Sequence, residues 1–275
     1  MKKLFFFLLL FNPAVITYSQ TSDEYFKKGN AKAELKDYVG AVEDYSKAIE
    51  INPKSFGAYY KRGAAKDKLQ DYTGAVEDYS KAIEIKPFEF YYEFRGIAKT
   101  NLQDYQEALS DFNKAIEINP TRESPYYNRA FTKVMLKDYK GAIVDYSKAI
   151  EINPKYEEAF VGRGILKDIL QDYRGAIADY SKGIDINKGI DIYQTLDIAY
   201  YYRGMAKGKL KDYRGAIADY SKAIQLNPKN AEAYHNRGVS RIILKQKDSG
   251  CLDLSKAGEL GDETAYEAIK SLCNK

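Results

Sequence analysis

The chain has 275 residues, and its 43 Lys and Arg against 39 Asp and Glu give a formal net charge of +4 at pH 7. Because acids and bases alternate along the chain, with no basic excess on one segment, this composition argues against a nucleic-acid partner. One histidine, His235, and two cysteines leave no material for a His/Cys metal cluster or a Ser–His–Asp set, so we expect no metal, no cofactor and no enzymatic activity.

The N-terminal segment has the layout of an export signal. Two lysines precede an unbroken apolar run over 4–11, and the small residues Thr17 and Ser19 suit the positions before a cleavage point. We predict a signal peptide over 1–19, cleaved at the Ser19–Gln20 bond, with an uncleaved anchor as the alternative. The mature chain would then be periplasmic, secreted or associated with the cell envelope, and we expect no transmembrane segment after the signal.

From residue 22 onward the chain repeats itself. A small residue that follows Arg or Lys recurs at intervals of 34, 33, 34, 34, 40 and 34 residues. These small residues are Gly29, Gly63, Gly96, Ala130, Gly164, Gly204 and Gly238. A period of 34 is the length of one helix–turn–helix unit. We predict seven units, near 22–55, 56–88, 89–122, 123–156, 157–190, 197–230 and 231–261.

Each unit carries the pattern of two helices. In the second half of unit six, Tyr213, Ala216, Ile217 and Tyr220 fall on one helical face. An aspartate precedes this half in six units and is predicted to cap the helix, and an Asn–Pro pair closes it in several. These aspartates are Asp37, Asp71, Asp104, Asp138, Asp172 and Asp212. Because one helical pair cannot bury its own apolar faces, stacked copies must bury each other's. We therefore predict an all-α fold, a right-handed α-solenoid over 20–260.

Opposite charges recur at fixed places in the units. Position seven is basic and position 23 is aspartate, as in Arg129 and Asp145 of unit four. We predict that these two residues pair, within one unit or across to the next. The alternative is that both are solvated surface charges, which would contribute only about 0–1 kcal/mol per pair.

These recurring residues resemble the tetratricopeptide repeat family. The likeness covers about 22–260 and rests on an aromatic residue at position four, the small residue at eight, alanine at 20, an aromatic at 24 and the closing proline. The chain departs from the family at positions seven and 11, where basic residues replace the usual leucine and aromatic. The resemblance, together with the export signal, implies an exported bacterial protein with a concave groove for a peptide or a partner's helix.

In the family, first-helix positions two, five, nine, 12 and 13 line that groove. In units three to five of this chain these positions are markedly apolar, which predicts a partner-binding patch. The predicted groove residues are Ile97, Tyr127, Phe131, Val134, Met135, Val161, Ile165 and Ile169. The alternative is that some of them pack between helices.

Three functions are consistent with these features. The first is a non-enzymatic scaffold of the cell envelope that binds a protein or peptide partner in the groove. The second is a structural envelope module that associates with itself through its outer face. The third is carbohydrate binding by the tyrosine doublets Tyr59–Tyr60, Tyr126–Tyr127 and Tyr201–Tyr202.

The repetition breaks at two places. Extra residues over 189–197 predict a longer loop or a lengthened helix, either neutral or a contact site. Beyond Gly261 a last helix over 262–275 would cap the stack. Cys251 and Cys273 lie on either side of this turn and would approach each other, which in an exported chain predicts a disulfide, with two buried thiols as the alternative.

Overall fold

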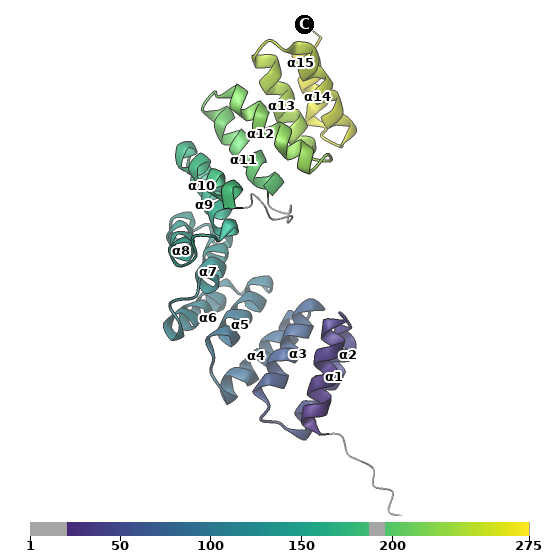
Figure 1. The fold of residues 1–275 in the computed structure, drawn as a ribbon, viewed down its shortest axis with the longest axis vertical. Coiled ribbons are helices and arrows are strands. Elements are labelled where there is room, and N and C mark those ends of the chain that lie inside the picture. Colours follow the sequence, from purple (N-terminus) through teal and green to yellow (C-terminus); the bar gives the residue numbers. More distant parts are fainter. Residues whose placement is uncertain (1–20, 187–195, 275) are drawn as a thin grey trace, which may run out of the picture. The chain divides into compact units, whose positions relative to one another are not determined.

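The computed structural model describes residues 21–186 and 196–274, and these form fifteen α-helices with no strand among them (Figure 1). The first helices of the seven pairs are α1 (Ser22–Glu34), α3 (Phe56–Lys68), α5 (Glu89–Asn101), α7 (Ser124–Met135), α9 (Glu157–Ile169), α11 (Leu196–Lys209) and α13 (Ala231–Ile243). The second helices are α2 (Tyr38–Ile51), α4 (Tyr72–Ile85), α6 (Tyr105–Ile118), α8 (Tyr139–Ile152), α10 (Tyr173–Ile186), α12 (Tyr213–Leu226) and α14 (Lys247–Glu259). The last helix, α15 (Thr264–Leu272), follows them. The prediction of an all-α repeat fold is therefore confirmed.

Two sequence predictions fall outside the described residues. One is the signal peptide over 1–19 with its cleavage bond. The other is most of the insertion over 189–197, of which only residues 196 and 197 are described, at the start of α11.

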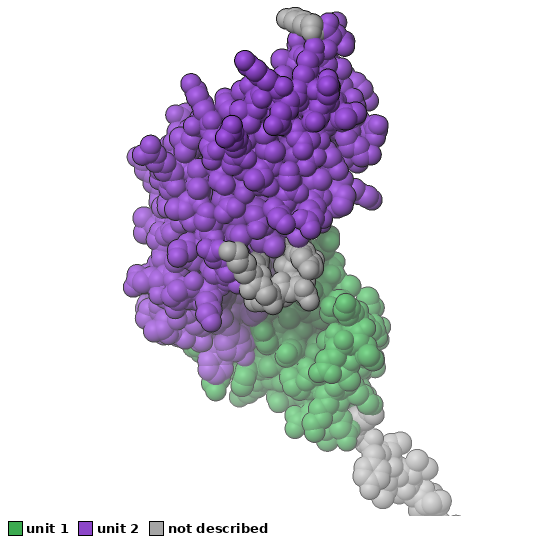
Figure 2. Space-filling model, turned by 45° about the horizontal axis from the view of Figure 1, so that its top comes forward, with its two compact units in different colours: residues 1–87 green, residues 88–275 purple. Residues whose placement is uncertain are grey.

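The chain divides into two compact units, coloured green and purple in Figure 2. They are called the N-terminal unit and the C-terminal unit, and the numbered units one to seven remain the repeats. The N-terminal unit is residues 1–87 and contains α1–α4, and the C-terminal unit is residues 88–275 and contains α5–α15. Within each unit every helix packs against the next one along the chain. Within each compact unit, each pair thus packs against its neighbours in sequence, as stacked repeats require.

Close contact between an aromatic ring of the second helix and a glycine of the first holds five of the seven pairs together. Tyr79 and Tyr180 on the second helices are fully buried. A Cβ atom added to the facing Gly63 would lie 2.9 Å from a ring carbon of Tyr79, and one added to Gly164 would lie 2.7 Å from Tyr180. In these five pairs a methyl group at position eight would displace the ring, whereas unit four accommodates Ala130 at this position.

Aspartate caps the second helix in five pairs, through bonds such as that from the Gly141 amide to Asp138 Oδ1 at 3.0 Å. The prediction is wrong for Asp104, whose side chain makes no cap bond. The difference lies three residues further on. In the capped helices that residue is glycine, and a Cβ atom on Gly141 would come within 2.1 Å of the capping carboxylate, whereas α6 has Glu107 in this place.

Every turn within a pair contains one non-glycine residue in the left-handed backbone region. These residues are Lys36, Gln70, Gln103, Lys137, Gln171, Lys211 and Lys245, with φ between 61° and 66°. An L-residue pays about 1–2 kcal/mol for this conformation because its Cβ crowds the following carbonyl, whereas glycine does not.

We therefore expect Lys137→Gly to stabilise the C-terminal unit by about 0.5–1 kcal/mol, after allowance for the greater backbone freedom of glycine in the unfolded chain. The same change at Lys182, inside α10, should destabilise it by about 1 kcal/mol. Urea unfolding followed by circular dichroism measures both variants. A loss of stability in Lys137→Gly would show that the left-handed turn carries no strain.

The predicted pairing of positions seven and 23 is confirmed, and it lies within the unit. Asp145 is 2% exposed and accepts hydrogen bonds from Arg129 Nε at 2.9 Å and Nη2 at 2.5 Å. Lys133 adds a third contact at 2.7 Å. Five further units repeat the arrangement, with the pairs Arg62–Asp78, Arg95–Asp111, Arg163–Asp179, Arg203–Asp219 and Arg237–Asp253. In unit one Lys32 binds Asp44 instead.

The same arginine also joins neighbouring repeats. Arg129 Nη1 donates to Asn113 on α6 at 2.6 Å, and Arg163 Nη1 donates to Ser147 on α8 at 2.9 Å. The Arg129 guanidinium further lies 5.5 Å from the Tyr126 ring centre, a cation–π contact. Arginine at position seven therefore replaces the leucine of the family by a planar group that links three helices.

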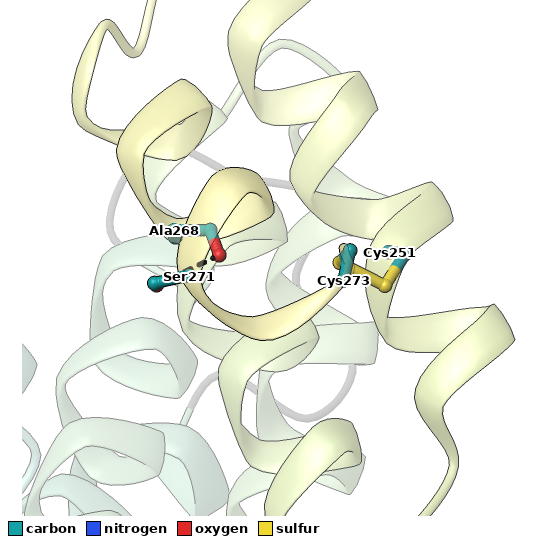
Figure 3. The surroundings of a disulfide bond; sticks show 4 residues. All are labelled: Cys251, Ala268, Ser271 and Cys273. Carbon is teal, nitrogen blue, oxygen red and sulfur yellow. Dashed lines mark hydrogen bonds between the residues drawn. A yellow bond between two sulfur atoms is a disulfide. The ribbon is translucent and has the colours of Figure 1, made fainter. Parts of the chain in front are cut away.

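The last two helices are joined covalently. Figure 3 shows Cys273, at the end of α15, bonded to Cys251 on α14, with Cα atoms 6.0 Å apart. Beside it the Ser271 hydroxyl donates to the Ala268 carbonyl at 3.1 Å within α15. His235 adds a polar link, because its Nδ1 lies 2.6 Å from Asp262 Oδ2 in the turn before α15.

Reduction of this disulfide should loosen the cap. The bond closes a loop with a sequence separation of 22 residues, for which the loss of loop entropy in the unfolded chain corresponds to about 3 kcal/mol. Reduction, or Cys251→Ser with Cys273→Ser, should lower the stability of the C-terminal unit accordingly. Thiol labelling of unreduced protein checks the pairing, and full labelling of both cysteines would contradict it.

Candidate partner-binding groove

Two adjoining pockets lie on the first-helix face of the C-terminal unit. The first, of about 230 Å³, is lined by Ile97, Thr100, Asn101, Phe112, Tyr127, Asn128, Phe131 and Thr132. The second, of about 300 Å³, is lined by Tyr127, Phe131, Val134, Tyr146, Glu158, Val161, Gly162, Ile165, Leu166 and Ile198. Because Tyr127 and Phe131 belong to both, we treat the two pockets as one groove, called the central groove below.

Tyr127 and Phe131 form the wall shared by the two pockets. The Tyr127 ring is fixed from both sides, with its centre 5.5 Å from that of Tyr146 and 5.0 Å from that of Tyr156. Burial, and then the nearby charge of Glu158, raise the pKa of its phenol. Phe131, one turn further along α7, is 45% exposed. A rigid aromatic wall with one freely accessible ring can contact an apolar ligand without first reorganising.

The structure brings six of the eight predicted groove residues to the central groove. Ile97 lines the first pocket, Val134, Val161 and Ile165 line the second, and the two aromatic residues line both. Met135 and Ile169 are exposed but line neither pocket.

Val161 differs from the other five because it is only 6% exposed and belongs to the core around Tyr180 and Ile184. The cause is Gly183 on α10, where a Cβ atom would lie 3.2 Å from Val161 Cγ2. The missing side chain lets Val161 sink between the helices. For this residue the alternative of packing between helices therefore holds, and Val161 contributes to the floor of the groove.

Polar residues that are not among the eight predicted ones lie at the other end of the groove: Thr100, Asn128 and Thr132 line the first pocket, and Glu93 and Arg122 are linked to it through Asn128. Thr100 and Thr132 approach each other through their hydroxyls at 2.9 Å. Asn128 donates to Glu93 at 3.1 Å, and Arg122 lies 3.0 Å from the other oxygen of the same carboxylate. Burial raises the pKa of Glu93 despite these partners. Glu93 occupies position five of its unit, which is a groove position, so its place in the repeat could have predicted that it lies near the groove.

Ile198 on α11 is a second residue that the sequence prediction missed. It extends the apolar lining of the second pocket to a third first helix. It lies at position two of unit six, which is a groove position. The prediction omitted it because it considered apolar residues of units three to five only.

A pocket in the N-terminal unit has a different character. It measures about 410 Å³, and its lining includes Asn30, Glu34, Lys61 and Lys68 beside aromatic and alanine residues. Tyr45 donates to Asn30 there at 2.8 Å. The apolar groove is thus a property of the C-terminal unit and of the residues that vary between its repeats.

The second rings of the tyrosine doublets take part in packing. Tyr60 lies 6.1 Å from Tyr79, Tyr127 5.5 Å from Tyr146 and Tyr202 6.2 Å from Tyr180, measured between ring centres. Rings held in this way offer less face to a sugar than free surface tyrosines would. The carbohydrate hypothesis stays a prediction.

Within residues 21–186 and 196–274, no group of three or more His, Cys, Asp or Glu side chains is arranged to hold a metal ion. Over the same ranges no helix has both the length and the apolar character that crossing a membrane needs.

Seven stacked helix–turn–helix pairs and a capping helix define the protein as an α-solenoid of the repeat class. Family models described as tetratricopeptide repeat match residues 56–89, 90–122 and 124–156, and one described as TPR repeat matches 29–70 and 204–241. Together they cover more than half of the chain. The chain belongs to the tetratricopeptide repeat family. A comparison with curated proteins gives no match.

Solved structures share the fold at low sequence identity. A tetratricopeptide repeat protein from Parabacteroides merdae is 24% identical, with a TM-score of 0.64 over 93% of this chain and 100% of that one. The C-terminal part of a TPR repeat-containing protein from Cytophaga hutchinsonii is 18% identical, with a TM-score of 0.70 over 89% and 99%. YrrB, described as a TPR protein with an unusual peptide-binding site, is 21% identical, with a TM-score of 0.62 over 71% and 99%.

Proposed function

We propose that this protein is a non-enzymatic scaffold that binds a segment of a protein partner in the central groove. The observation that carries the proposal is Phe131, a large apolar ring left 45% exposed in the wall between two apolar pockets. Contiguous exposed apolar surface of this kind marks interaction sites. Repeat solenoids use the face formed by successive first helices to bind extended ligands, and YrrB is described as having a peptide-binding site.

The composition of the groove supports a peptide or helix more than a small molecule. Its two pockets are open, adjoin each other and draw their lining from four first helices, α5, α7, α9 and α11. A segment lying across them would place one apolar side chain in each pocket, on either side of Phe131. Apolar burial would supply most of the affinity, at roughly 25 cal/mol per Å² removed from water.

We further propose that the protein acts outside the cytoplasm, in the periplasm or cell envelope or as a secreted protein. Two features support this location. The N-terminal sequence has the layout of a signal peptide, and the only two cysteines of the chain are within bonding reach and joined. Structural disulfides persist in oxidising compartments and are rare in reducing ones.

Charge placed in the groove should abolish partner binding and leave the fold intact. We expect Phe131→Glu combined with Ile165→Glu to lose at least about 100-fold in affinity, because two carboxylates would be desolvated against apolar walls. Phe131 is exposed, whereas Ile165 is partly buried against the core around Tyr180, so the double mutant should lower the thermal midpoint but still unfold cooperatively. Val144→Glu, on the exposed surface of α8, is the matched control.

The measurement is affinity capture from an envelope extract of the source cells with the wild-type, double-mutant and Val144→Glu proteins as baits. A partner retained by wild type and by Val144→Glu but lost from the double mutant, and then rebound as a pure protein with the same ranking, supports the proposal. Equal recovery on all three baits would move the binding surface away from the groove.

Exposed apolar side chains outside the groove keep the self-association hypothesis open as a second candidate. Val144 on α8 and Leu252 on α14 are among the most exposed large apolar residues of the described chain, at 66% and 72%. Sedimentation over a range of protein concentrations tests this candidate. Association that Val144→Glu or Leu252→Glu removes, and that the groove double mutant leaves unchanged, would favour the structural module over the scaffold.

A further inference from the structure

The charge around the central groove indicates what kind of partner segment it takes. Two carboxylates of α9 occupy groove positions of the repeat: Glu158, in the first turn, lines the second pocket, and Asp168, in the last turn, stands at position 12 and lines neither pocket. Ten residues of helix separate them, which is about 15 Å at 1.5 Å per residue. Val161 and Ile165, both in the lining of the second pocket, lie between them.

Among the described residues, Asp168 lacks a partner at both of its oxygens, whereas Asp67 at the same repeat position lacks one only at Oδ1. The Oδ1 atom of Asp168 is inaccessible to solvent and has no hydrogen-bond partner, and among residues 21–186 and 196–274 its side chain makes no ion pair. The hydroxyl of Tyr180 on α10 likewise has no hydrogen-bond partner, and the whole residue is buried, at 0% exposed. Buried polar atoms in folded proteins are nearly always paired, so two such atoms near one another call for an explanation.

The same two repeat positions in unit two provide an internal comparison. Asp67 and Tyr79 stand twelve residues apart, as Asp168 and Tyr180 do, and there the tyrosine hydroxyl donates to the carboxylate at 2.5 Å. The repeat geometry can therefore close this bond. In unit five this bond is open, so the partly exposed Asp168 carboxylate is left for a third group, while the Tyr180 hydroxyl is enclosed by the fold.

The surroundings of Asp168 favour a cation as that third group. Burial, and next the charge of Asp168, raise the pKa of Tyr180, so the carboxylate is close to the phenol. The Tyr180 ring is stacked with Tyr202 at 6.2 Å, which adds aromatic faces that attract cations. Asp168 also lies in the last turn of α9, where the helix dipole places partial negative charge. Burial raises the pKa of Asp168, and among the described residues only the charge of Lys209 on α11 opposes this rise, without forming an ion pair.

We propose that the partner segment carries a Lys or Arg at each end of a short apolar stretch, one basic side chain binding Asp168 and the other Glu158. This inference rests on the proposed groove function. An apolar stretch that spans about 15 Å is four to five residues of extended chain, at about 3.3 Å per residue, or about ten residues of helix. The apolar side chains occupy the second pocket while the two cations fix the register and direction of the segment.

The test is selection of a random 12-residue peptide library on the purified full-length protein. The expected consensus contains apolar residues flanked by Lys or Arg. A synthetic consensus peptide should bind Asp168→Asn at least about 10-fold more weakly than wild type, and replacement of its basic residue by Glu should cause a similar loss. Asp67→Asn, the matched position in unit two, should bind as wild type does.

Stability distinguishes a ligand-binding role of Asp168 from a structural one. Asp168→Asn should leave the thermal midpoint unchanged or raise it, because the native side chain has no partner to lose. Asp67→Asn should lower the midpoint, because an amide oxygen accepts the Tyr79 hydroxyl more weakly than a carboxylate does. A marked loss of stability in Asp168→Asn would overturn the inference by showing that the carboxylate already serves the fold.

The two levels of the proposal fail in different ways. Groove-dependent peptides without a basic bias, or a consensus peptide that binds Asp168→Asn as tightly as wild type, would overturn the charge inference and leave the groove function in place. Enriched peptides that bind the Phe131→Glu, Ile165→Glu variant unchanged, or no enrichment at all, would overturn the groove function together with it.

Discussion

Raising the pH from 10 to about 11.5 should unfold the protein cooperatively. Burial is the largest cause that raises the pKa of six core tyrosines, to about 12 for Tyr45. The other five are Tyr79, Tyr146, Tyr180, Tyr201 and Tyr220. All but Tyr201 recur because the repeat places an aromatic side chain of the second helix against the small residues of a first helix, whereas Tyr201 lies on the first helix α11.

The direction of the effect follows from linkage. A tyrosine of the unfolded chain titrates near pH 10, while its folded counterpart keeps the proton to a higher pH. The stability that these tyrosines contribute is therefore fully present below pH 10 and is lost as the pH rises through the folded values. In that window the contribution of each tyrosine to the free energy of unfolding falls by about 1.4 kcal/mol per pH unit. Six tyrosines together therefore lower the free energy of unfolding by about 8 kcal/mol per pH unit, comparable with the whole stability of a domain.

Absorbance at 295 nm and circular dichroism, recorded on one sample, measure the coupling between phenolate formation and helix loss. The two signals should change together. Tyr180→Phe, which removes a hydroxyl without a partner, should move the transition to higher pH, while the same change at the exposed Tyr266 should not. Core tyrosines that ionise near pH 10 with the helices intact would contradict the prediction.

Asp145→Asn should destabilise the C-terminal unit by about 3–5 kcal/mol. The substitution removes the negative charge that Arg129 and Lys133 share and leaves two cations against a buried amide. A buried ion pair stabilises a fold little more than apolar residues of the same size would. Removing only one partner is nevertheless strongly destabilising, because the remaining charge stays desolvated without its counter-charge. Urea unfolding measures the difference.

An exposed pair on the same helix is the control for this variant. Lys148 and Glu151 lie 2.8 Å apart on α8 with both side chains largely in solvent, so Glu151→Gln should cost less than about 1 kcal/mol. A double-mutant cycle with Arg129→Met completes the test. A cost for Asp145→Asn as small as that for Glu151→Gln, with no coupling to Arg129, would show that the repeated pairs are ordinary surface charges.

The sequence was sufficient to predict the helices and the pairing of charges because both follow from the 34-residue period. Helical faces, capping aspartates and the Arg–Asp pair recur at fixed positions, so each copy supports the others. Asp104 is the exception, because it stands at the capping position but makes no cap bond. Its capping position was predictable, but loss of the cap depended on Glu107, three residues away, in place of glycine.

The groove was predicted less completely because its depth depends on contacts between repeats. Position numbers identify which side chains face the groove side, and six of eight predicted residues do line it. They do not show that Gly183 lets Val161 sink into the core, or that Asp168 stays apart from Tyr180 while Asp67 bonds Tyr79. These differences arise from small local shifts that a shared sequence pattern cannot encode.

Photo-crosslinking in the source cells tests the central claim most directly. Benzoylphenylalanine would replace Phe131 in the central groove in one variant and Val144 on α8 in another, both exposed positions of the same unit. We predict a discrete adduct with a different protein from position 131 and none from position 144, with the crosslinked peptide containing Lys or Arg beside apolar residues. Adducts from position 144 alone, above all adducts with a second copy of this chain, would contradict the account.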